Sequence, residues 1–589
     1  MKHLLPLAGL ILSANLAPAQ GPVFDWVNGI EILGTNLGDS SCEDVKTDAM
    51  GNVISAGWFK GNIDFDTDPT FGVNTYLNSN GQQAGYLQKV DANGDFVWAV
   101  KLGSTGTVRL FGLDVDAAGN SYVSGYFFGT ADMDPGSGVE ELIAVGGADV
   151  FIVKINADGT LGWARQIGDV GNEVGYSLVL DDAGNITLAG VFEGTVDMDP
   201  GTGTTQLTSV GYSDMFVSKL DPAGDLIWAR QLSPTTPGNG HEEELEHTID
   251  GDGNLLVTGW FTAGFDFDPG PAVLELNTTG NTDLFVLKLD PNGDLVWVKQ
   301  VGSTSSAGTT TGEGIDTDLA DNVYIAGRFT HITDFDPGPG LLQLPATSSG
   351  TYILKLDANG DFQWVREIVG NQSDVARDIA VVADGTSYTI GYFTGTPDFD
   401  NGPGTFTITS SFSGTADVYI LKLDATGNFV WAGAMGSSET DFGKAIHLSD
   451  DGTLHAIGNY SDPVDSIYPE LDFDPGPAEA TILSNSANPQ GFFLVQLTDN
   501  GSVGMAANND DHMLAVYPNP SAGTVAIDLR GVTGPRALRV LDRTGRLVQE
   551  VALRDPLVLD HQLPEQPGLY LVQVVTASGS VLSTRVVRM

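Results

Sequence analysis

Residues 175–232 read GYSLVLDDAGNITLAGVFEGTVDMDPGTGTTQLTSVGYSDMFVSKLDPAGDLIWARQL and contain four apolar runs, GYSLVLD, ITLAGVF, MFVSKLD and LIWARQL. Each run has the length of a β-strand, is rich in Val, Ile, Leu and aromatic residues, and is bounded by Gly, Asp and Asn. The turns DDAGN and DPAGD suit short hairpin loops, because Asp caps the turn and Gly adopts the left-handed backbone. The stretch therefore predicts four strands joined mainly by hairpins.

The same pattern recurs seven times along the chain. Equivalent tryptophans recur every 65 to 72 residues, at Trp26, Trp98, Trp163, Trp228, Trp297, Trp364 and Trp431. A Gly-x-aromatic slot recurs as GWF (57–59), GYF (125–127), GVF (190–192), GWF (259–261), GRF (327–329), GYF (391–393) and GNY (458–460). Near-continuous apolar runs indicate strands buried on both faces, as in an all-β, seven-bladed β-propeller with stacked blades. Separate sandwich domains are excluded, because the regular turns leave no linkers.

The two ends of the repeat region are complementary. The segment VFDWVNGI (23–30) has the form of a fourth strand and precedes the first repeat, whereas the last repeat ends with its third strand, GFFLVQLTDNGS (491–502). We therefore predict that residues 23–30 pair with residues 492–498. This pairing would close the last blade and remove two exposed strand edges.

The pattern NVYIAGRF (322–329), DFDPGPG (334–340) and LDPNGDLVWVKQVG (289–302) resembles the SBBP repeat, named for a seven-bladed β-propeller. The resemblance covers roughly residues 22–503. It implies a propeller fold and no particular activity.

The N-terminus has the features of a secretory signal peptide over residues 1–19. Lys2 and His3 precede an apolar run, and Ala17-Pro18-Ala19 has the form of a cleavage site. No later stretch is apolar for long enough to predict a membrane span. The only cysteine, Cys42, is expected to be a small buried side chain, so disulfides do not hold this secreted chain together.

The formal net charge is −50, and it is unevenly distributed. Residues 514–589 contain eight arginines, no lysine and six acidic residues, so the negative charge lies in the rest of the chain. Such an acidic body would repel nucleic acid and anionic membranes, and would attract cations.

Residues 514–589 differ in character from the repeats and follow a linker at 504–513, which ends the predicted propeller domain of 20–503. ALRVLDRTGRLVQEV (537–551) reads as one hairpin and residues 567–589 as a second. About seven short strands in this segment suit a small Ig-like β-sandwich.

This segment resembles the type A C-terminal sorting domain of the type IX secretion system. The matching motifs are Val516 followed by Tyr517, Pro518, Asn519 and Pro520, then Leu541-Asp542-x-x-Gly545, then Gly568-Leu569-Tyr570. The family usually ends in a lysine-rich strand, and here Arg585 and Arg588 keep the charge. The resemblance implies recognition by the type IX secretion machinery, export, removal of the domain, and release or anchoring at the outer cell surface. The alternative is an ordinary accessory sandwich.

An aspartate pair followed by Pro-Gly or a related turn recurs once in each repeat. The first copy is DFDTDPT (64–70), and the others provide candidate calcium ligands at Asp132, Asp134, Asp197, Asp199, Asp266, Asp268, Asp334, Asp336, Asp398, Asp400, Asp472 and Asp474. Oxygen-rich loops suit calcium, although two carboxylates supply only part of the roughly 6–8 oxygens required. The favoured interpretation is a turn in which the side chains accept bonds from backbone amides. Because all copies are alike, none stands out as a catalytic pair.

The third strand of six repeats carries a lysine, at Lys89, Lys154, Lys219, Lys288, Lys355 and Lys422, and the seventh carries Gln496. A lysine in an apolar strand needs a carboxylate partner. We predict that these lysines approach the aspartate-pair loops.

No catalytic motif is recognisable, and no cofactor other than calcium is indicated. HEEELEH (241–247) has the wrong spacing for an HExxH zinc motif, and His247 aligns with core positions of other repeats such as Val45. The sequence therefore predicts a non-catalytic surface propeller that binds an extracellular protein or glycan. The alternatives are a propeller enzyme acting on extracellular glycans, for which an acid–base pair would be expected near the irregular segments 234–247 or 461–470, and a calcium-stabilised propeller.

Overall fold

The computed structural model describes residues 22–33, 40–65, 76–103, 105–237, 245–345, 349–370, 374–400, 402, 404–449, 451–461, 471–475, 481–482 and 490–498, and seven strands after residue 514. All regular elements in these ranges are β-strands. Within this described part of the chain, no helix has the length and apolar character needed to cross a membrane. The signal peptide and the linker at 504–513 lie outside the described residues.

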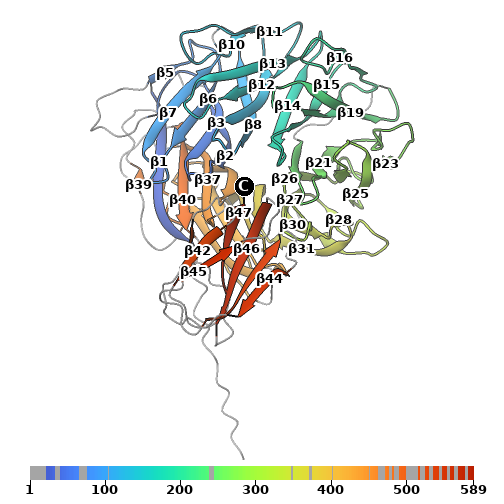
Figure 1. Cartoon of the computed structure of the whole chain (residues 1–589). Helices are drawn as coiled ribbons and strands as arrows, with labels where there is room; N and C mark the ends of the chain where they lie inside the picture. Colours follow the sequence, from blue (N-terminus) through green and yellow to red (C-terminus); the bar gives the residue numbers. More distant parts are fainter. Residues whose placement is uncertain are drawn as a thin grey trace, which may run out of the picture.

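Seven four-stranded antiparallel sheets surround a central axis and form a seven-bladed β-propeller, as predicted (Figure 1). The strands of each blade are given from the axis outwards. Blade 1 consists of β2 (Ser41–Thr47), β3 (Val53–Phe59), β6 (Ala84–Val90) and β7 (Phe96–Leu102), and blade 2 of β8 (Val108–Val115), β9 (Ser121–Phe127), β12 (Asp149–Ile155) and β13 (Leu161–Ile167). Blade 3 consists of β14 (Glu173–Leu180), β15 (Ile186–Phe192), β18 (Asp214–Leu220) and β19 (Leu226–Pro234), and blade 4 of β20 (Glu246–Ile249), β21 (Leu255–Phe261), β24 (Asp283–Leu289) and β25 (Leu295–Ser303).

Blades 5 to 7 follow the same order. Blade 5 consists of β26 (Thr310–Thr317), β27 (Val323–Phe329), β30 (Gly350–Leu356) and β31 (Phe362–Ile368). Blade 6 consists of β32 (Val375–Val381), β33 (Ser387–Thr394), β34 (Ala416–Leu423) and β35 (Phe429–Met435). Blade 7 consists of β36 (Phe442–Leu448), β37 (Thr453–Ser461), β40 (Gln490–Thr498) and β1 (Val23–Leu33).

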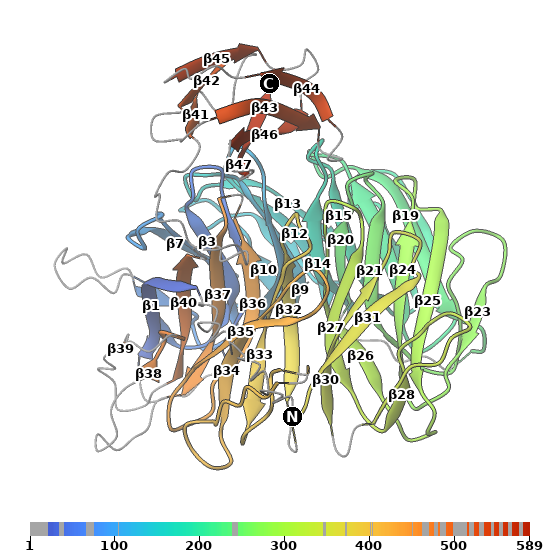
Figure 2. The same ribbon diagram turned by 90° about the horizontal axis from the view of Figure 1, so that it is seen from below.

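The N-terminal strand β1 is the fourth strand of blade 7. It pairs antiparallel with β40, from Val23 opposite Thr498 to Ile30 opposite Phe492, and the two strands lie side by side in Figure 2. The pairing predicted from the missing fourth strand is therefore present.

The apolar core lies between the blades. One core cluster combines Ile54 and Leu87 of blade 1 with Leu113 and Phe151 of blade 2, all of them fully buried. In β3 all seven residues are buried, which is why both faces of the strand are apolar and the sequence lacks strict alternation.

Five of the seven repeated tryptophans attach their blade to the next one. The indole Nε1 on a fourth strand donates to a carbonyl oxygen in the turn between the third and fourth strands of the following blade. The pairs are Trp26 with Ala92, Trp98 with Ala157, Trp228 with Pro291, Trp297 with Ala358, and Trp364 with Ala425, at 3.1–3.3 Å. Trp26 makes this bond across the closure, so blade 7 is attached to blade 1 in the same way.

The turn DLADN (318–322) tests the expected role of glycine in the hairpins. Asp321 replaces the usual glycine and has a φ of 58°, so the left-handed conformation is retained without glycine. Its Oδ1 accepts a bond of 2.8 Å from the amide of Gly251 in blade 4.

The last seven strands form two sheets. The first has the order β41 (Ala515–Tyr517), β42 (Thr524–Asp528), β45 (Val558–Gln562), and the second has the order β44 (Leu547–Ala552), β43 (Pro535–Asp542), β46 (Gly568–Thr576), β47 (Val581–Arg588). The two predicted hairpins are β43–β44 and β46–β47. The Ig-like character of this segment stays a prediction.

Candidate functional site

The aspartate pairs lie on short arms between the second and third strands of the blades. Most arms are hairpins: β4 (Asn62–Asp64) with β5 (Tyr76–Asn78), β10 (Thr130–Asp132) with β11 (Glu141–Ile143), β16 (Thr195–Asp197) with β17 (Gln206–Thr208), β22 (Gly264–Asp266) with β23 (Glu275–Asn277), β28 (Ile332–Asp334) with β29 (Gln343–Pro345), and β38 (Leu471–Asp472) with β39 (Thr481–Ile482). Asp66 of the first copy lies outside the described residues.

The carboxylates of these pairs accept hydrogen bonds from the arms' own backbone. In blade 5, Asp334 Oδ1 accepts from the amides of Asp336 and Leu342, and Asp336 Oδ1 accepts from the amide of Gly338. The same three bonds recur at Asp132 and Asp134, Asp197 and Asp199, Asp266 and Asp268, and Asp398 and Asp400, and Asp472 accepts from the amide of Asp474. A structural turn therefore accounts for these residues. Within the described ranges, no group of three or more His, Cys, Asp or Glu residues is arranged to hold a metal ion.

The arms also join neighbouring blades. The fourth strand of one blade continues past its sheet and pairs with the arm of the next blade, as β25 does with β28 through Gly302 and Asp334. Equivalent main-chain pairing joins β1 to β4, Gly103 to Asp132, β19 to β22, Val369 to Asp398, and Gly436 to Asp472. The aspartate pair thus shapes a turn that holds two blades together.

The third-strand lysines pair with carboxylates, but the predicted partners were wrong. In blades 1 to 5 the lysine reaches the first aspartate of the turn between the first and second strands of its own blade. The Nζ–Oδ2 distances are 2.8 Å for Lys89–Asp48, 3.7 Å for Lys154–Asp116, 2.8 Å for Lys219–Asp181, 2.7 Å for Lys288–Asp250 and 3.2 Å for Lys355–Asp318. Strands 1 and 3 run in the same direction, so the end of strand 3 lies beside this turn, whereas the aspartate-pair arm is at the other end of the blade.

Blades 6 and 7 depart from this arrangement. In blade 6 the turn begins with Val382, and the Lys422 ammonium lies 5.3 Å from the centre of the Tyr388 ring. In blade 7 the lysine is replaced by Gln496, whose Oε1 bonds to His455 Nε2 at 3.0 Å. His455 in turn bonds to Ser449, which occupies the aspartate position.

The first strands of all seven blades line a central cavity of about 380 Å³. In six blades this strand contains a β-bulge, which leaves one extra residue unpaired. A bulge re-aims the extra side chain away from the regular ladder. These residues, with the corresponding Leu245 of blade 4, form what we call the mouth ring: Glu43, Phe111, Tyr176, Leu245, Glu313, Arg377 and Lys444. They also line an adjoining cavity of about 270 Å³.

The glycine of the Gly-x-aromatic slot is required by this bulge. A Cβ on Gly125 would lie 1.9 Å from the carbonyl oxygen of Arg109, and a Cβ on Gly391 would lie 1.9 Å from that of Val375. The aromatic residue that ends the slot, such as Phe127, is fully buried. The variable middle residue lies beside the mouth ring, as Trp58 and Tyr126 do.

The mouth ring has an aromatic part and a charged part. In blades 2 and 3 the Phe111 ring lies 5.7 Å from Tyr176 and 5.8 Å from Tyr126, between ring centres. On the other side, Glu313 pairs with Arg377 at 2.9 Å and with Arg328 at 3.3 Å.

Blades 7 and 1 contribute one further ion pair to the mouth. Glu43 pairs with Lys444 at 3.5 Å and accepts a bond of 3.1 Å from Trp58 Nε1. Both glutamates of the mouth ring are therefore held by cations.

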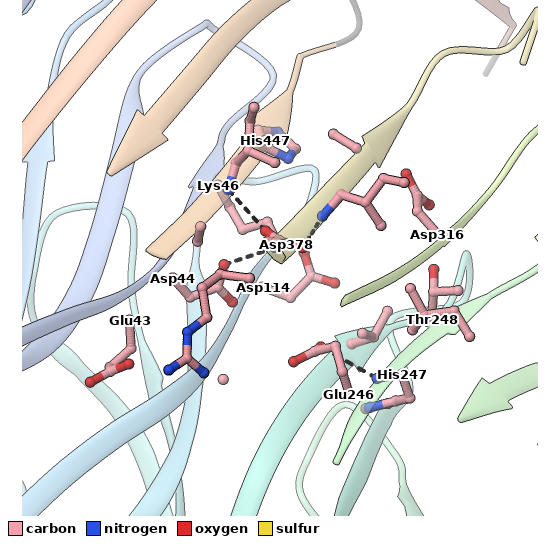
Figure 3. Close-up of a pocket in the computed structure, with 18 of the residues that line it drawn as sticks. Glu43, Asp44, Lys46, Asp114, Glu246, His247, Thr248, Asp316, Asp378 and His447 are labelled. Atoms are coloured by element: carbon pink, nitrogen blue, oxygen red, sulfur yellow. Dashed lines mark hydrogen bonds and ion pairs between the residues drawn. The ribbon is translucent and has the colours of Figure 1, made fainter. Parts of the chain in front are cut away.

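Deeper in the channel, four carboxylates connect adjacent first strands. Each accepts one bond from the amide of the next residue and one from an amide of the following blade. The inter-blade bonds run to Asp44 from Leu113, to Asp114 from Leu180, to Asp316 from Val381, and to Asp378 from Ile446, at 2.7–3.0 Å. Lys46 lies among Asp44, Asp114 and Asp378 (Figure 3), and its Nζ pairs with Asp44 at 3.0 Å.

Burial perturbs the protonation of these groups. It raises the pKa of Glu246 to about 8, of Asp316 to about 7, and of Asp114 and Asp378 to about 6. Burial opposes the charge of Lys46, but the surrounding carboxylates outweigh it and raise the lysine pKa. The deep channel is consequently less charged near neutral pH than its composition indicates.

His247 and Cys42 have structural roles, as expected. His247 is buried, and its ring nitrogens bond to Thr187 Oγ1 at 2.9 Å and Ser177 Oγ at 2.8 Å. Burial lowers the His247 pKa to about 3 and raises that of the Cys42 thiol. His241 lies outside the described residues.

We expected broken symmetry in the irregular segments 234–247 and 461–470, of which residues 238–244 and 462–470 lie outside the described residues. Only Leu245 of the mouth ring lies in either segment. The sequence does contain a signal that marks the mouth ring. The ring residues stand two positions before the aligned core residues Val45, Leu113, Leu178, His247, Ile315, Ile379 and Ile446, and they differ from repeat to repeat. Only the shared bulge shows that they face the same opening.

Two segments match known families. Residues 515–588 match the secretion system C-terminal sorting domain, and residues 296–336 match the SBBP β-propeller repeat. This chain is a β-propeller repeat protein with a C-terminal secretion sorting domain. The sorting domain indicates interaction with the type IX secretion machinery and export to the cell surface or the medium. In its motif, Tyr517 ends β41, and Pro518, Asn519 and Pro520 lie outside the described residues.

The chain is also similar to other proteins. The chain is 24% identical over 478 residues to an uncharacterised WD repeat-containing protein of Acanthamoeba polyphaga mimivirus; the match covers 69% of this chain and 34% of that protein's length. A protein of unknown function from Dyadobacter fermentans is 10% identical, with a TM-score of 0.30, over 65% of this chain and 96% of its own. The PQQ domain of pyranose dehydrogenase from Coprinopsis cinerea is 11% identical, with a TM-score of 0.28, over 66% and 92%.

Proposed function

We propose that the exported chain is a non-catalytic binding protein that holds an extracellular ligand at the mouth of its central channel. One observation carries the proposal. The repeats are alike in their core and turns, whereas the mouth ring has a different occupant in nearly every blade. A position that only shapes the blade is filled similarly in most repeats: the core position two residues after the mouth ring is aliphatic in six repeats and His247 in the seventh. A position that contacts a ligand has no such constraint.

The residues at the mouth suit binding. Phe111 and Tyr176 remain half-buried and pack against each other, so they present rigid apolar faces whose ordering costs little entropy. Aromatic residues and arginines dominate the energetics of binding surfaces. The mouth ring combines both.

The two mouth-ring glutamates favour binding over catalysis. An acid–base catalyst needs a carboxyl group that can exchange a proton with the substrate. Glu43 is held by Lys444 and Trp58, and Glu313 by Arg377 and Arg328.

The proposal is tested by screening the chain without its predicted signal peptide, residues 20–589, here called the mature chain, against extracellular glycans and matrix proteins. Tyr176→Ala is expected to weaken binding of a ligand from the screen at least tenfold, because one hot-spot aromatic contributes more than about 1.4 kcal/mol. Phe412→Ala is the matched control, since Phe412 is 56% exposed and lines neither cavity. Equal binding by both variants contradicts the proposed site, and conversion of a bound glycan to shorter products contradicts a non-catalytic role.

A further inference from the structure

We infer that the mouth binds an acidic sugar, a uronate unit of an extracellular polysaccharide, and that Arg109 receives the sugar carboxylate. This inference rests on the proposed binding function and specifies its ligand.

Arg109 differs from the other arginines of the propeller. Three of them, Arg165, Arg230 and Arg366, lie on fourth strands, stack on the tryptophan two residues earlier and donate to carbonyl oxygens of the next blade. Two more, Arg328 and Arg377, share Glu313. Arg109 lines the mouth cavity, and among the described residues no carboxylate lies within ion-pair distance of it.

The guanidinium of Arg109 is held in a fixed orientation. Its Cζ lies 4.3 Å from the centre of the Trp58 ring and 6.0 Å from that of Tyr126, and its Nε donates to Gln83 Oε1 at 2.8 Å. Stacking fixes the plane. The hydrogen-bond partners of the guanidinium, Gln83 and Tyr126, are neutral, so among the described residues no anion pairs directly with its positive charge. A planar, pre-oriented guanidinium is suited to two parallel hydrogen bonds with a carboxylate.

The charge around the mouth favours an anion even though the body is acidic. Two carboxylates at the mouth, Glu43 and Glu313, are outnumbered by four cations: Arg109, Arg328, Arg377 and Lys444. Burial raises the pKa of Glu246 to about 8, so this third carboxyl group is largely neutral at pH 7. The exposed carboxylates elsewhere on the body are screened by salt, since the Debye length is about 8 Å at physiological ionic strength. The channel carboxylates Asp44, Asp114 and Asp378 face Lys46. Local charge therefore decides which ligands enter.

The aromatic part of the ring favours a sugar over an acidic side chain. Phe111, Tyr126 and Tyr176 lie next to one another and beside the Arg109 stack. A uronate combines a rigid chair-form ring, which has C–H groups on one face, with a carboxylate at its edge, so one unit satisfies both features. An aspartyl or glutamyl side chain supplies the carboxylate without the apolar face.

The test uses oligogalacturonate and alginate oligomers, each beside its methyl-esterified form, with affinity measured by titration calorimetry on the mature chain. We expect each acid oligomer to bind on the order of 10- to 100-fold more tightly than its ester. Arg109→Gln should lower the affinity for the acid oligomer to that for the ester. Arg366→Gln removes a stacked arginine from a fourth strand and should leave the ratio of the two affinities unchanged.

Three outcomes overturn the inference. The acid and the ester bind with equal affinity; Arg109→Gln lowers the affinity for the acid and for the ester by the same factor; or neither acid oligomer binds at millimolar concentration. If a neutral glycan or a protein binds instead and loses affinity in Tyr176→Ala, the proposed function stands without this ligand. If poly-glutamate binds with the same dependence on Arg109 and the uronates do not, the ligand is an acidic peptide. If no ligand depends on Tyr176, both proposals fall.

Discussion

An ion pair between the third-strand lysine and a turn aspartate recurs in blades 1 to 5. In blade 4 the side chains of Lys288 and Asp250 are only 7% and 0% exposed. Burial alone would raise the Asp250 pKa, yet bonds from Lys288, from Asn254 and from its own turn lower it below the ordinary value. The lysine therefore neutralises a turn carboxylate that the fold has already buried.

Removal of one partner should destabilise the propeller strongly. We expect Lys288→Met to reduce the free energy of unfolding by about 3–5 kcal/mol, because it leaves Asp250 charged and buried. Lys299→Met breaks a pair with Asp361, whose side chain is 70% exposed, and should cost about 0–1 kcal/mol. Chemical denaturation of both variants measures the difference, and equal losses would contradict the role of burial.

Two kinds of element join the blades: the fourth strands, through their tryptophans, and the arms. Strand β1 takes part in both, because Trp26 reaches Ala92 of blade 1 and Ile32 pairs with Ile63 of β4. It also covers the edge of β40. The N-terminal strand therefore holds three parts of the ring together.

Deleting residues 20–33 from the mature chain should lower its melting temperature and promote self-association, because β40 then has an unpaired edge. Adding a peptide of residues 22–33 in trans should restore the melting temperature, whereas the same peptide carrying Trp26→Ala should restore less. Scanning calorimetry with light scattering measures both effects. A truncated chain that melts like the intact one would show that β1 is dispensable for closure.

The aspartate pairs on the arms are where binding of calcium can be tested. Because Asp334 Oδ1 already accepts two backbone amides, we expect neither calcium nor EDTA to change the melting temperature. Asp334→Ala should cost about 1–3 kcal/mol, since two amides lose their acceptor. A rise of several degrees in millimolar calcium, absent in matched magnesium, would instead establish a metal-stabilised propeller.

At the scale of the whole molecule, acidic groups fall into two classes with opposite dependence on pH. The turn aspartates that meet lysines, such as Asp250, have lowered pKa values, so their contribution is present above about pH 4 and is lost as the pH falls further. The channel carboxylates Asp114, Glu246, Asp316 and Asp378 have raised pKa values and bind their protons more tightly in the folded chain. Their contribution is largest at low pH and decreases as the pH rises.

The free energy of unfolding should consequently decrease between about pH 5 and pH 8. Glu246 has the highest of these values, a pKa of about 8, so Glu246→Gln should raise the melting temperature at pH 8 and leave it nearly unchanged at pH 5. Glu140→Gln, on an exposed part of an arm, controls for the loss of one negative charge from an acidic protein. A Glu246 variant with the same pH profile as the Glu140 variant would contradict the raised pKa.

The sequence by itself determined the blade count, the four-stranded repeat, the closing strand and the sorting domain. These features depend on information that is local in the chain: strand-length apolar runs, turns with Asp and Gly, and a terminal strand without a partner in its own repeat. The aspartate pairs belong to the same class, because their acceptors and amides lie within eight residues of each other.

Tertiary structure decided which groups meet. The partner of Lys288 depends on which end of the blade the third strand reaches, and the aspartate-pair arm is at the opposite end. The mouth ring depends on a bulge that turns one residue per blade toward the axis, and the Arg109 stack depends on Trp58 of the preceding blade. Such contacts join residues that are distant in the chain, such as Lys288 with Asp250 and Arg109 with Trp58, so their geometry follows from the packing of strands and blades and not from any local pattern.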